Sequence, residues 1–89
     1  MISKEDKIKL TVIAKKYKVS KLYLFGSNLD PERDSNDIDL AVEGIPASQF
    51  FKFYGELLFS LSKPIDLIDL KKLSSFNTIV KSEGILLYG

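Results

Sequence analysis

The chain has 89 residues, 45% of them hydrophobic and 28% charged, with a formal net charge of +1, and this length has room for one domain with one modest core. It contains no cysteine and no histidine, which excludes disulfides, thiolate metal sites and a histidine base, so any bound metal needs oxygen ligands. It also lacks a long apolar run and a signal-peptide pattern, so we expect a cytoplasmic protein without a membrane span.

The first predicted element is a helix over about residues 4–18. Ser3 can cap its N-terminus, and Glu5 and Asp6 lie in the first turn, where the helix dipole favours negative charge. The lysines of this segment predict a solvated face. The spacing i, i+3, i+4, i+7 predicts a buried face made of Leu10, Ile13, Ala14 and Tyr17.

A strand–loop–strand unit follows. The first strand, over about residues 21–26, ends in Gly26 and Ser27, and nine polar or turn-prone residues separate it from Asp37 and Asp39 on the second strand. Residues two apart on a strand share a face, and two carboxylates this close repel unless a cation lies between them. Mg²⁺ prefers one or two carboxylates with substrate phosphates. Gly26 lets backbone N–H groups approach a phosphate, and the Ser27 hydroxyl can donate to it, so the unit predicts a metal and phosphate site.

Charge is unevenly distributed around this unit. Residues 1–21 hold seven lysines against two acidic residues, whereas residues 28–43 hold six acidic residues against one arginine. Tracking a nucleic-acid backbone needs a continuous basic stripe, so we expect no direct nucleic-acid binding. The acidic block suits cations better.

The next predicted element is a helix over about residues 47–62. Two interpretations of its wide aromatic stripe stay open: all of it packs on the sheet, or part of it contacts a partner. Phe51 lies beside the stripe and is the residue we would expect at such an interface. The stripe itself consists of Phe50, Phe53, Tyr54, Leu57, Leu58 and Leu61.

The third strand, over about residues 65–70, carries Asp66 and Asp69 on opposite faces, so at most one of them can join the face of Asp37 and Asp39. We favour Asp66, in the middle of the strand, and leave Asp69 as the alternative. Asp69, near the strand end, is better suited to capping the following turn.

The last predicted helix spans about residues 75–83, begins at Ser74 or Ser75, and turns Phe76, Ile79 and Val80 inward. Gly84 is expected as its left-handed stop, and residues 85–88 as an apolar end that packs back onto the core. A helical crossover makes the second and third strands parallel, whereas the loop between the first two suits antiparallel pairing. The expected fold class is α/β (α+β), a small mixed sheet with helices in the order α-β-β-α-β-α.

The pattern of Gly-Ser at 26–27, nine residues, and Asp-Ile-Asp-Leu at 37–40 resembles the signature of the DNA polymerase β-like nucleotidyltransferase superfamily. The short chain resembles its minimal nucleotidyltransferase (MNT) domains, which serve as antitoxins beside HEPN toxins. The resemblance covers nearly the whole chain, and it implies the nucleotidyltransferase fold and a single MNT domain over residues 1–89.

The resemblance also implies roles for individual residues. Asp37, Asp39 and Asp66 would be catalytic and hold two Mg²⁺ ions, while Gly26 and Ser27 would bind the nucleoside triphosphate. The implied reaction is transfer of a nucleoside monophosphate, AMP from ATP, to a hydroxyl such as a tyrosine of a partner HEPN toxin.

The segment after Ser27 departs from the family pattern. Many relatives carry Ala-Arg-Gly where this chain has Leu29-Asp30-Pro31, and Arg33 is the candidate in this loop to replace the missing guanidinium. The alternative is therefore a catalytically degenerate antitoxin, a binding module that neutralises a HEPN-type partner by complex formation.

Overall fold

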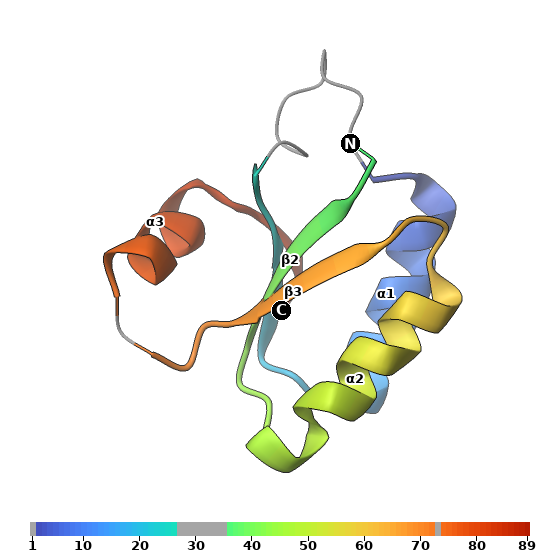
Figure 1. Cartoon of the computed structure of the whole chain (residues 1–89), viewed down its shortest axis with the longest axis horizontal. Helices are drawn as coiled ribbons and strands as arrows, with labels where there is room; N and C mark the ends of the chain where they lie inside the picture. Colours follow the sequence, from blue (N-terminus) through green and yellow to red (C-terminus); the bar gives the residue numbers. More distant parts are fainter. Residues whose placement is uncertain (1, 27–35, 73) are drawn as a thin grey trace.

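The computed structural model describes residues 2–26, 36–72 and 74–89 (Figure 1). Within these residues, one four-stranded sheet has the strand order β3-β2-β1-β4. β1 is antiparallel to both β2 and β4, whereas β2 and β3 are parallel, which confirms the predicted mixed sheet. The elements along the chain are α1 (Lys4–Lys16), β1 (Lys21–Leu24), β2 (Ile38–Glu43), α2 (Ala47–Ser60), β3 (Ile65–Asp69), α3 (Ser75–Glu83) and β4 (Ile85–Tyr88).

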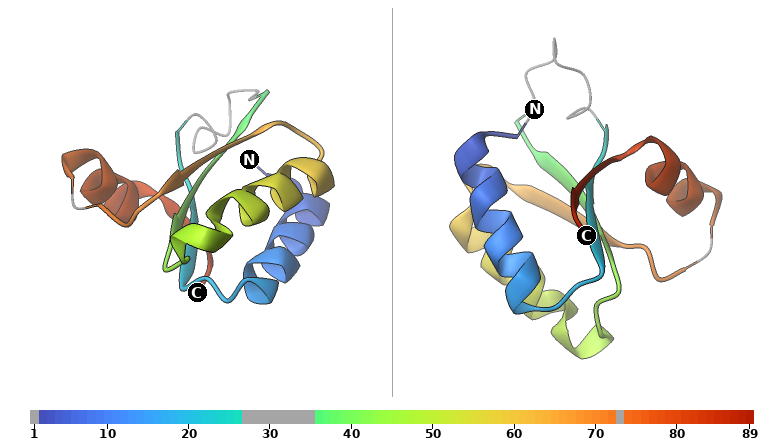
Figure 2. Two further views of the ribbon diagram at one scale, coloured as in Figure 1. Left: turned by 60° about the horizontal axis from the view of Figure 1, so that its bottom comes forward. Right: turned by 180° about the vertical axis from the view of Figure 1, so that it is seen from behind.

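The two faces of the sheet are covered differently. α1 and α2 lie on one face, and α3 lies on the other (Figures 1 and 2). The main core fills the space beneath α1 and α2, and its side chains include Leu10, Leu22, Leu40, Phe53 and Leu57. A smaller cluster on the α3 face consists of Tyr23, Ala41, Leu70 and Val80, with Phe25 and Ile68 packed against it.

α1 begins and packs as its sequence predicts. The Ser3 side chain accepts a hydrogen bond from the backbone N–H of Asp6 at 3.1 Å, and the predicted apolar face is buried, with Tyr17 half-buried. The sequence did not indicate that Asp6 itself is buried, at 3% exposed. Its carboxylate accepts hydrogen bonds from the backbone N–H of Ser62, at 3.2 Å, and from the Ser62 hydroxyl. Asp6 therefore fixes the start of α1 to the turn after α2.

The aromatic stripe of α2 divides between core and surface. Within the stripe, Phe53 and Leu57 are fully buried, whereas Leu58 is 49% exposed. Outside it, Phe51 is 79% exposed and Phe59 is 91% exposed. The helix ends at Ser60, slightly earlier than predicted. Neither α2 nor any other helix in the described residues has the length and apolar character needed to cross a membrane.

The C-terminal part differs from the prediction in three ways. Residues 85–88 do reach the core, but they do so as β4, an additional strand paired with β1. Gly84 has a φ of −70° and is not a left-handed stop. A Cβ at Gly84 would lie 2.6 Å from the Val80 carbonyl oxygen, so close backbone approach explains the glycine. Of the three predicted inward side chains of α3, only Val80 is buried, while Phe76 and Ile79 are more than half exposed.

Candidate active site

Two carboxylates meet on the parallel strand pair at the centre of the site. The register of β2 and β3 places Asp39 directly beside Asp66. The flanking residues Leu40 and Leu67 are buried in the main core, so both carboxylates extend to the opposite face, which carries α3. Asp66 is exposed and Asp39 is half-buried. Neighbouring strands are about 4.8 Å apart, which brings the two acidic groups within direct electrostatic reach.

Asp37 lies just before β2, which begins at Ile38. It is exposed and belongs to the same acidic group, because its charge acts on Asp39. Burial first, and then the negative charges of Asp66 and Asp37, raise the pKa of the Asp39 carboxyl above its ordinary value. The negative charges of Asp37 and Asp66 therefore both act on Asp39, so the three carboxylates predicted from the sequence form one electrostatic unit that attracts a cation.

Gly26 contacts this unit directly. Its φ of +72° lies in the left-handed region, and a Cβ added there would lie only 2.5 Å from Oδ2 of Asp39. The preceding residue, Phe25, donates its backbone N–H to the Asp39 carbonyl oxygen at 3.1 Å. Glycine is thus required both by the backbone conformation and by the carboxylate packed against it. Ser27, the rest of the predicted phosphate motif and Arg33 lie outside the described residues.

The two acids of β3 have separate surroundings. Asp69 pairs in register with Val42, three residues farther along the strand than the pair of Asp39 and Asp66. Its Oδ1 accepts a hydrogen bond from the backbone N–H of Lys71 at 3.0 Å, which is the turn capping expected from the sequence. Asp66 is therefore the acid of β3 that lies beside Asp39.

The acidic group has the composition of a shared metal site. In the parts of the chain that the structure describes, no three or more acidic side chains come close enough to hold a metal ion by themselves. Mg²⁺ is usually bound by one or two carboxylates together with phosphate oxygens and water. The donor set of Asp37, Asp39 and Asp66 fits a Mg²⁺ ion that is bound jointly with a nucleotide, and it does not fit an all-protein cage.

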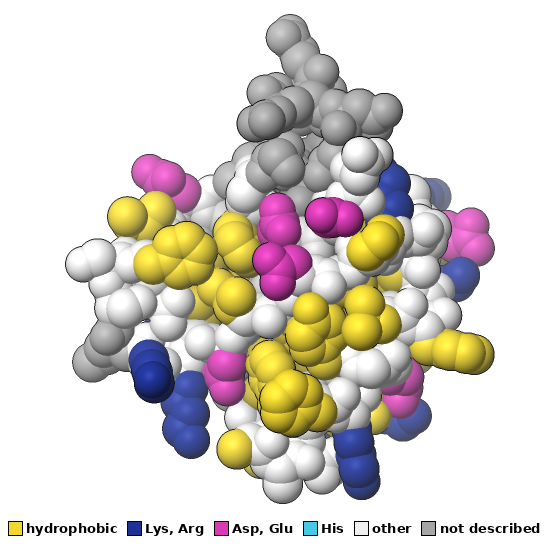
Figure 3. All heavy atoms as spheres, viewed as in Figure 1, with side chains coloured by type: hydrophobic (Ala, Val, Ile, Leu, Met, Phe, Trp, Pro, Cys, Tyr) yellow, Lys and Arg dark blue, Asp and Glu magenta, His cyan; other side chains and the backbone are white. Residues whose placement is uncertain are grey.

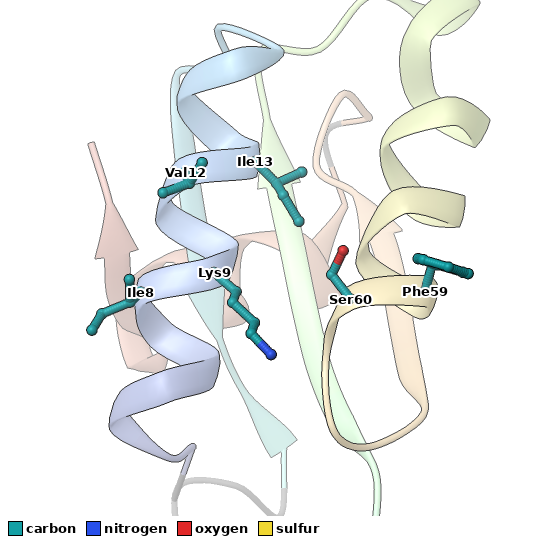
Figure 4. A pocket seen from close by; sticks show the side chains of 6 residues that line it. All are labelled: Ile8, Lys9, Val12, Ile13, Phe59 and Ser60. Carbon is teal, nitrogen blue, oxygen red and sulfur yellow. The ribbon is translucent and has the colours of Figure 1, made fainter.

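A groove lies between α1 and α2, on the opposite side of the sheet from the carboxylates (Figure 4). Its volume is about 390 Å³, and most of the side chains around it are apolar. Because it lies behind the main core, this groove is separate from the acidic site. Its lining consists of Ile8, Lys9, Val12, Ile13, Phe59 and Ser60.

Comparison with protein families decides the assignment of this chain. The family model described as polymerase beta, nucleotidyltransferase matches residues 7–89. The chain belongs to this family. The match confirms the resemblance predicted from the Gly-Ser and Asp-x-Asp motifs, and the mixed sheet is the fold expected for it.

Solved structures are similar over nearly the whole chain, whereas no curated protein matches the sequence. A toxin–antitoxin crystallised with AMP-PNP contains a chain with 28% identity and a TM-score of 0.74, and the match covers 98% of this chain and 74% of that one. The complex of a tri-AMPylated Shewanella oneidensis HEPN toxin with MNT antitoxin contains a chain with 26% identity and a TM-score of 0.71. The match covers 94% of this chain and 70% of that one. A mutant of the toxin–antitoxin MntA–HpeT contains a chain with 26% identity and a TM-score of 0.73. The match covers 93% of this chain and 72% of that one.

Proposed function

We propose that this protein is an MNT-type antitoxin that transfers AMP from ATP to a hydroxyl group of a partner HEPN toxin. The observation that carries the proposal is the pairing of Asp39 with Asp66 beside Gly26, in a chain of the nucleotidyltransferase family. Two relatives support the choice of nucleotide and acceptor: one was crystallised with AMP-PNP, and another complex contains an AMPylated HEPN toxin.

In this proposal Asp37, Asp39 and Asp66 hold two Mg²⁺ ions. Bound Mg²⁺ neutralises phosphate charge and stabilises the attacking and leaving oxygens. Burial, and then the charges of Asp66 and Asp37, raise the pKa of Asp39, and a bound cation would favour its charged form. Gly26 lets the triphosphate approach the backbone, and Ser27 is proposed to donate its hydroxyl to a phosphate oxygen.

The reaction is an in-line displacement at the α-phosphorus of ATP. An acceptor hydroxyl, proposed to belong to a tyrosine of the HEPN toxin, forms a new bond to this phosphorus, while the bond to the bridging oxygen breaks and pyrophosphate leaves. Asp66 is exposed and pairs in register with Asp39, and it is proposed to accept the proton of the attacking hydroxyl.

A second candidate is an antitoxin that neutralises the HEPN toxin by binding alone. Its support is the apolar surface on the α1 and α2 side, where Ile8, Val12 and Phe59 are exposed around the groove and Phe51 is exposed on α2. Exposed aromatic and aliphatic side chains of this kind are typical of interface centres. In this candidate the partner docks on α1 and α2, and the acidic site has no catalytic use.

Calorimetry and a transfer assay separate the two candidates. The full chain, alone and with a co-purified HEPN partner, is titrated with ATP in the presence and absence of Mg²⁺, and AMP transfer is followed with α-labelled ATP. We expect Mg²⁺-dependent ATP binding and labelling of the partner. Complex formation without any ATP binding would support the binding-only candidate instead.

A substitution tests the carboxylates within the same assay. We expect Asp37→Asn to reduce transfer by about 10²- to 10³-fold, the scale of removing one preorganised electrostatic group. Asp69→Asn is the matched control, because Asp69 caps a turn away from the acidic pair, and it should leave transfer close to wild type. Wild-type transfer by Asp37→Asn would refute the proposed metal role.

A further inference from the structure

We propose that Phe76 and Phe25 form a stacking platform for the nucleobase of the bound nucleotide, an inference that rests on the proposed function. Phe76 lies in the first turn of α3 and is 54% exposed. Its ring contacts that of Phe25 edge to face, with the ring centroids 5.9 Å apart and an interplanar angle of 82°. Such a contact covers at most one face of one ring, which leaves ring surface available for stacking.

The platform is directly connected to the acidic site. Phe25 precedes Gly26, and its backbone N–H is hydrogen-bonded to the Asp39 carbonyl oxygen. The Phe25 side chain packs against the small cluster on the α3 face, which is the face that carries Asp39 and Asp66. In Figure 3, where α3 lies at the left, acidic side chains gather at the upper centre and hydrophobic side chains lie beside them toward α3.

This arrangement orients the nucleotide. With the phosphates at Gly26 and the carboxylates, the base extends across Phe25 toward α3. Stacking on an aromatic ring is available to every base, and the rings of Phe25 and Phe76 carry no group that could hydrogen-bond to a base edge. The platform therefore contributes to affinity for any nucleoside triphosphate, and by itself it does not distinguish adenine from guanine.

The exposure of Phe76 also separates it from the core aromatics. Phe53 is completely buried under α2, so the fold can enclose a phenylalanine where packing requires one. Phe76 and its neighbour Ile79, one turn later, remain more than half exposed at the edge of the nucleotide face. Phe76 contacts Phe25, the residue that precedes Gly26, and this position favours bound nucleotide as the occupant. A surface of the HEPN partner is the occupant that the experiment must exclude.

The test compares two ligands that share phosphates but differ in the base. Affinities of the full chain for ATP and for inorganic tripolyphosphate are measured by calorimetry with Mg²⁺. We expect Phe76→Ala to weaken ATP binding about tenfold, the scale of removing one base–aromatic stack, and to leave tripolyphosphate binding unchanged. Phe76→Trp should restore ATP affinity. Phe51→Ala, which removes an even more exposed phenylalanine from α2, is the matched control and should change neither affinity.

A conservative variant covers the case in which Phe76→Ala folds poorly. Phe76→Leu keeps the apolar contact with Phe25 but removes the π-face, so it should weaken ATP binding in the same way. Wild-type ATP affinity in folded Phe76→Ala or Phe76→Leu would overturn the platform, as would equal weakening of both ligands.

The remaining outcomes distinguish this inference from the proposed function. If the wild-type chain bound neither ATP nor tripolyphosphate, the nucleotide site itself would be wrong, and the platform with it. If ATP affinity were intact but Phe76→Leu bound the HEPN partner more weakly, Phe76 would belong to the partner surface, and only the platform would be refuted.

Discussion

The two faces of the sheet differ in composition although the same strands form both. On β2, Ile38, Leu40 and Val42 enter the main core beneath α1 and α2, while the intervening residues Asp39 and Ala41 point to the α3 face. The first face is closed by two long helices and is almost entirely apolar. The second has a small core and an acidic edge beside Gly26. We therefore expect the larger apolar core on the first face to offset the cost of holding repelling carboxylates on the second.

The largest expected effect lies on the closed face. Phe53→Ala should lower the free energy of unfolding by about 3–5 kcal/mol, because Phe53 is fully buried and packs edge to face on Tyr17 at 5.5 Å. Chemical denaturation measures this loss. Phe59→Ala, on the same helix but 91% exposed, is the control and should change stability by no more than about 0.5 kcal/mol. Similar losses for the two variants would mean that α2 is not packed as described.

A second prediction concerns Gly26, which packs against the Asp39 carboxylate on the α3 side of the sheet. Gly26→Ala should cost about 1–2 kcal/mol from the left-handed backbone, and its Cβ should also displace the Asp39 carboxylate. Gly55→Ala is the matched control, because Gly55 is helical with open space at its Cβ position, so the substitution should stabilise by about 0.5–1 kcal/mol. Denaturation midpoints check both. Equal and favourable effects would show that residue 26 is not constrained.

Asp39 should make the free energy of unfolding depend on pH, and the sign of this dependence follows from its raised pKa. Because its pKa is raised in the folded protein, the folded state keeps a proton that the unfolded chain has released, and the free energy of unfolding falls as pH rises through that range. In metal-free buffer at neutral pH, Asp39→Asn should therefore have a higher Tm than wild type. The difference should disappear below about pH 4, where both states are protonated. A lower Tm for Asp39→Asn at neutral pH would contradict the repulsion.

The same measurement with Mg²⁺ sharpens the test. Added Mg²⁺ and ATP should raise the Tm of wild type, because ligands that bind only the folded state stabilise it. Asp39→Asn should respond much less. An equal response would place the ion elsewhere.

The smallest expected effect on stability is at Phe51. Phe51→Ser should change the free energy of unfolding of the isolated chain by about 0.5 kcal/mol or less, since the side chain is 79% exposed. If α2 contacts the HEPN partner, the same variant should weaken their association in a pull-down or calorimetric titration. A stable variant that still binds would place the interface elsewhere, and one that unfolds would show Phe51 to be part of the core.

The sequence alone predicted the features of the site that follow from the alternation of side chains along a strand. The i, i+2 spacing placed Asp39 away from the core residues Ile38 and Leu40, and the glycine ending the first strand was expected near it. The caps at Ser3 and Ser74 also followed from local chemistry, because each accepts a hydrogen bond from an N–H three residues later. The catalytic, metal-binding and phosphate-binding roles of these residues remain predictions.

Other features needed the tertiary structure. The sequence alone left Asp66 and Asp69 as alternatives, and only the register of β3 on β2 brought Asp66 beside Asp39. Residues 85–88 read as an apolar end, because nothing local showed that the open edge of β1 would accept them as a fourth strand. The exposure of Phe76 was missed for a related reason: its apolar spacing fits a buried helix face, but α3 is short and covers only part of its side of the sheet.

The sequence by itself therefore determined the family, the order of the elements from α1 to α3 and the residues that supply charge to the site, because motif spacing and side-chain alternation are properties of neighbouring residues. The tertiary structure decided which acid pairs with Asp39, that Asp6 joins α1 to Ser62, and that Gly84 is required by close backbone contact. Each of these depends on residues far apart in the chain, whose meeting is fixed only when the whole sheet and its two unequal faces are assembled.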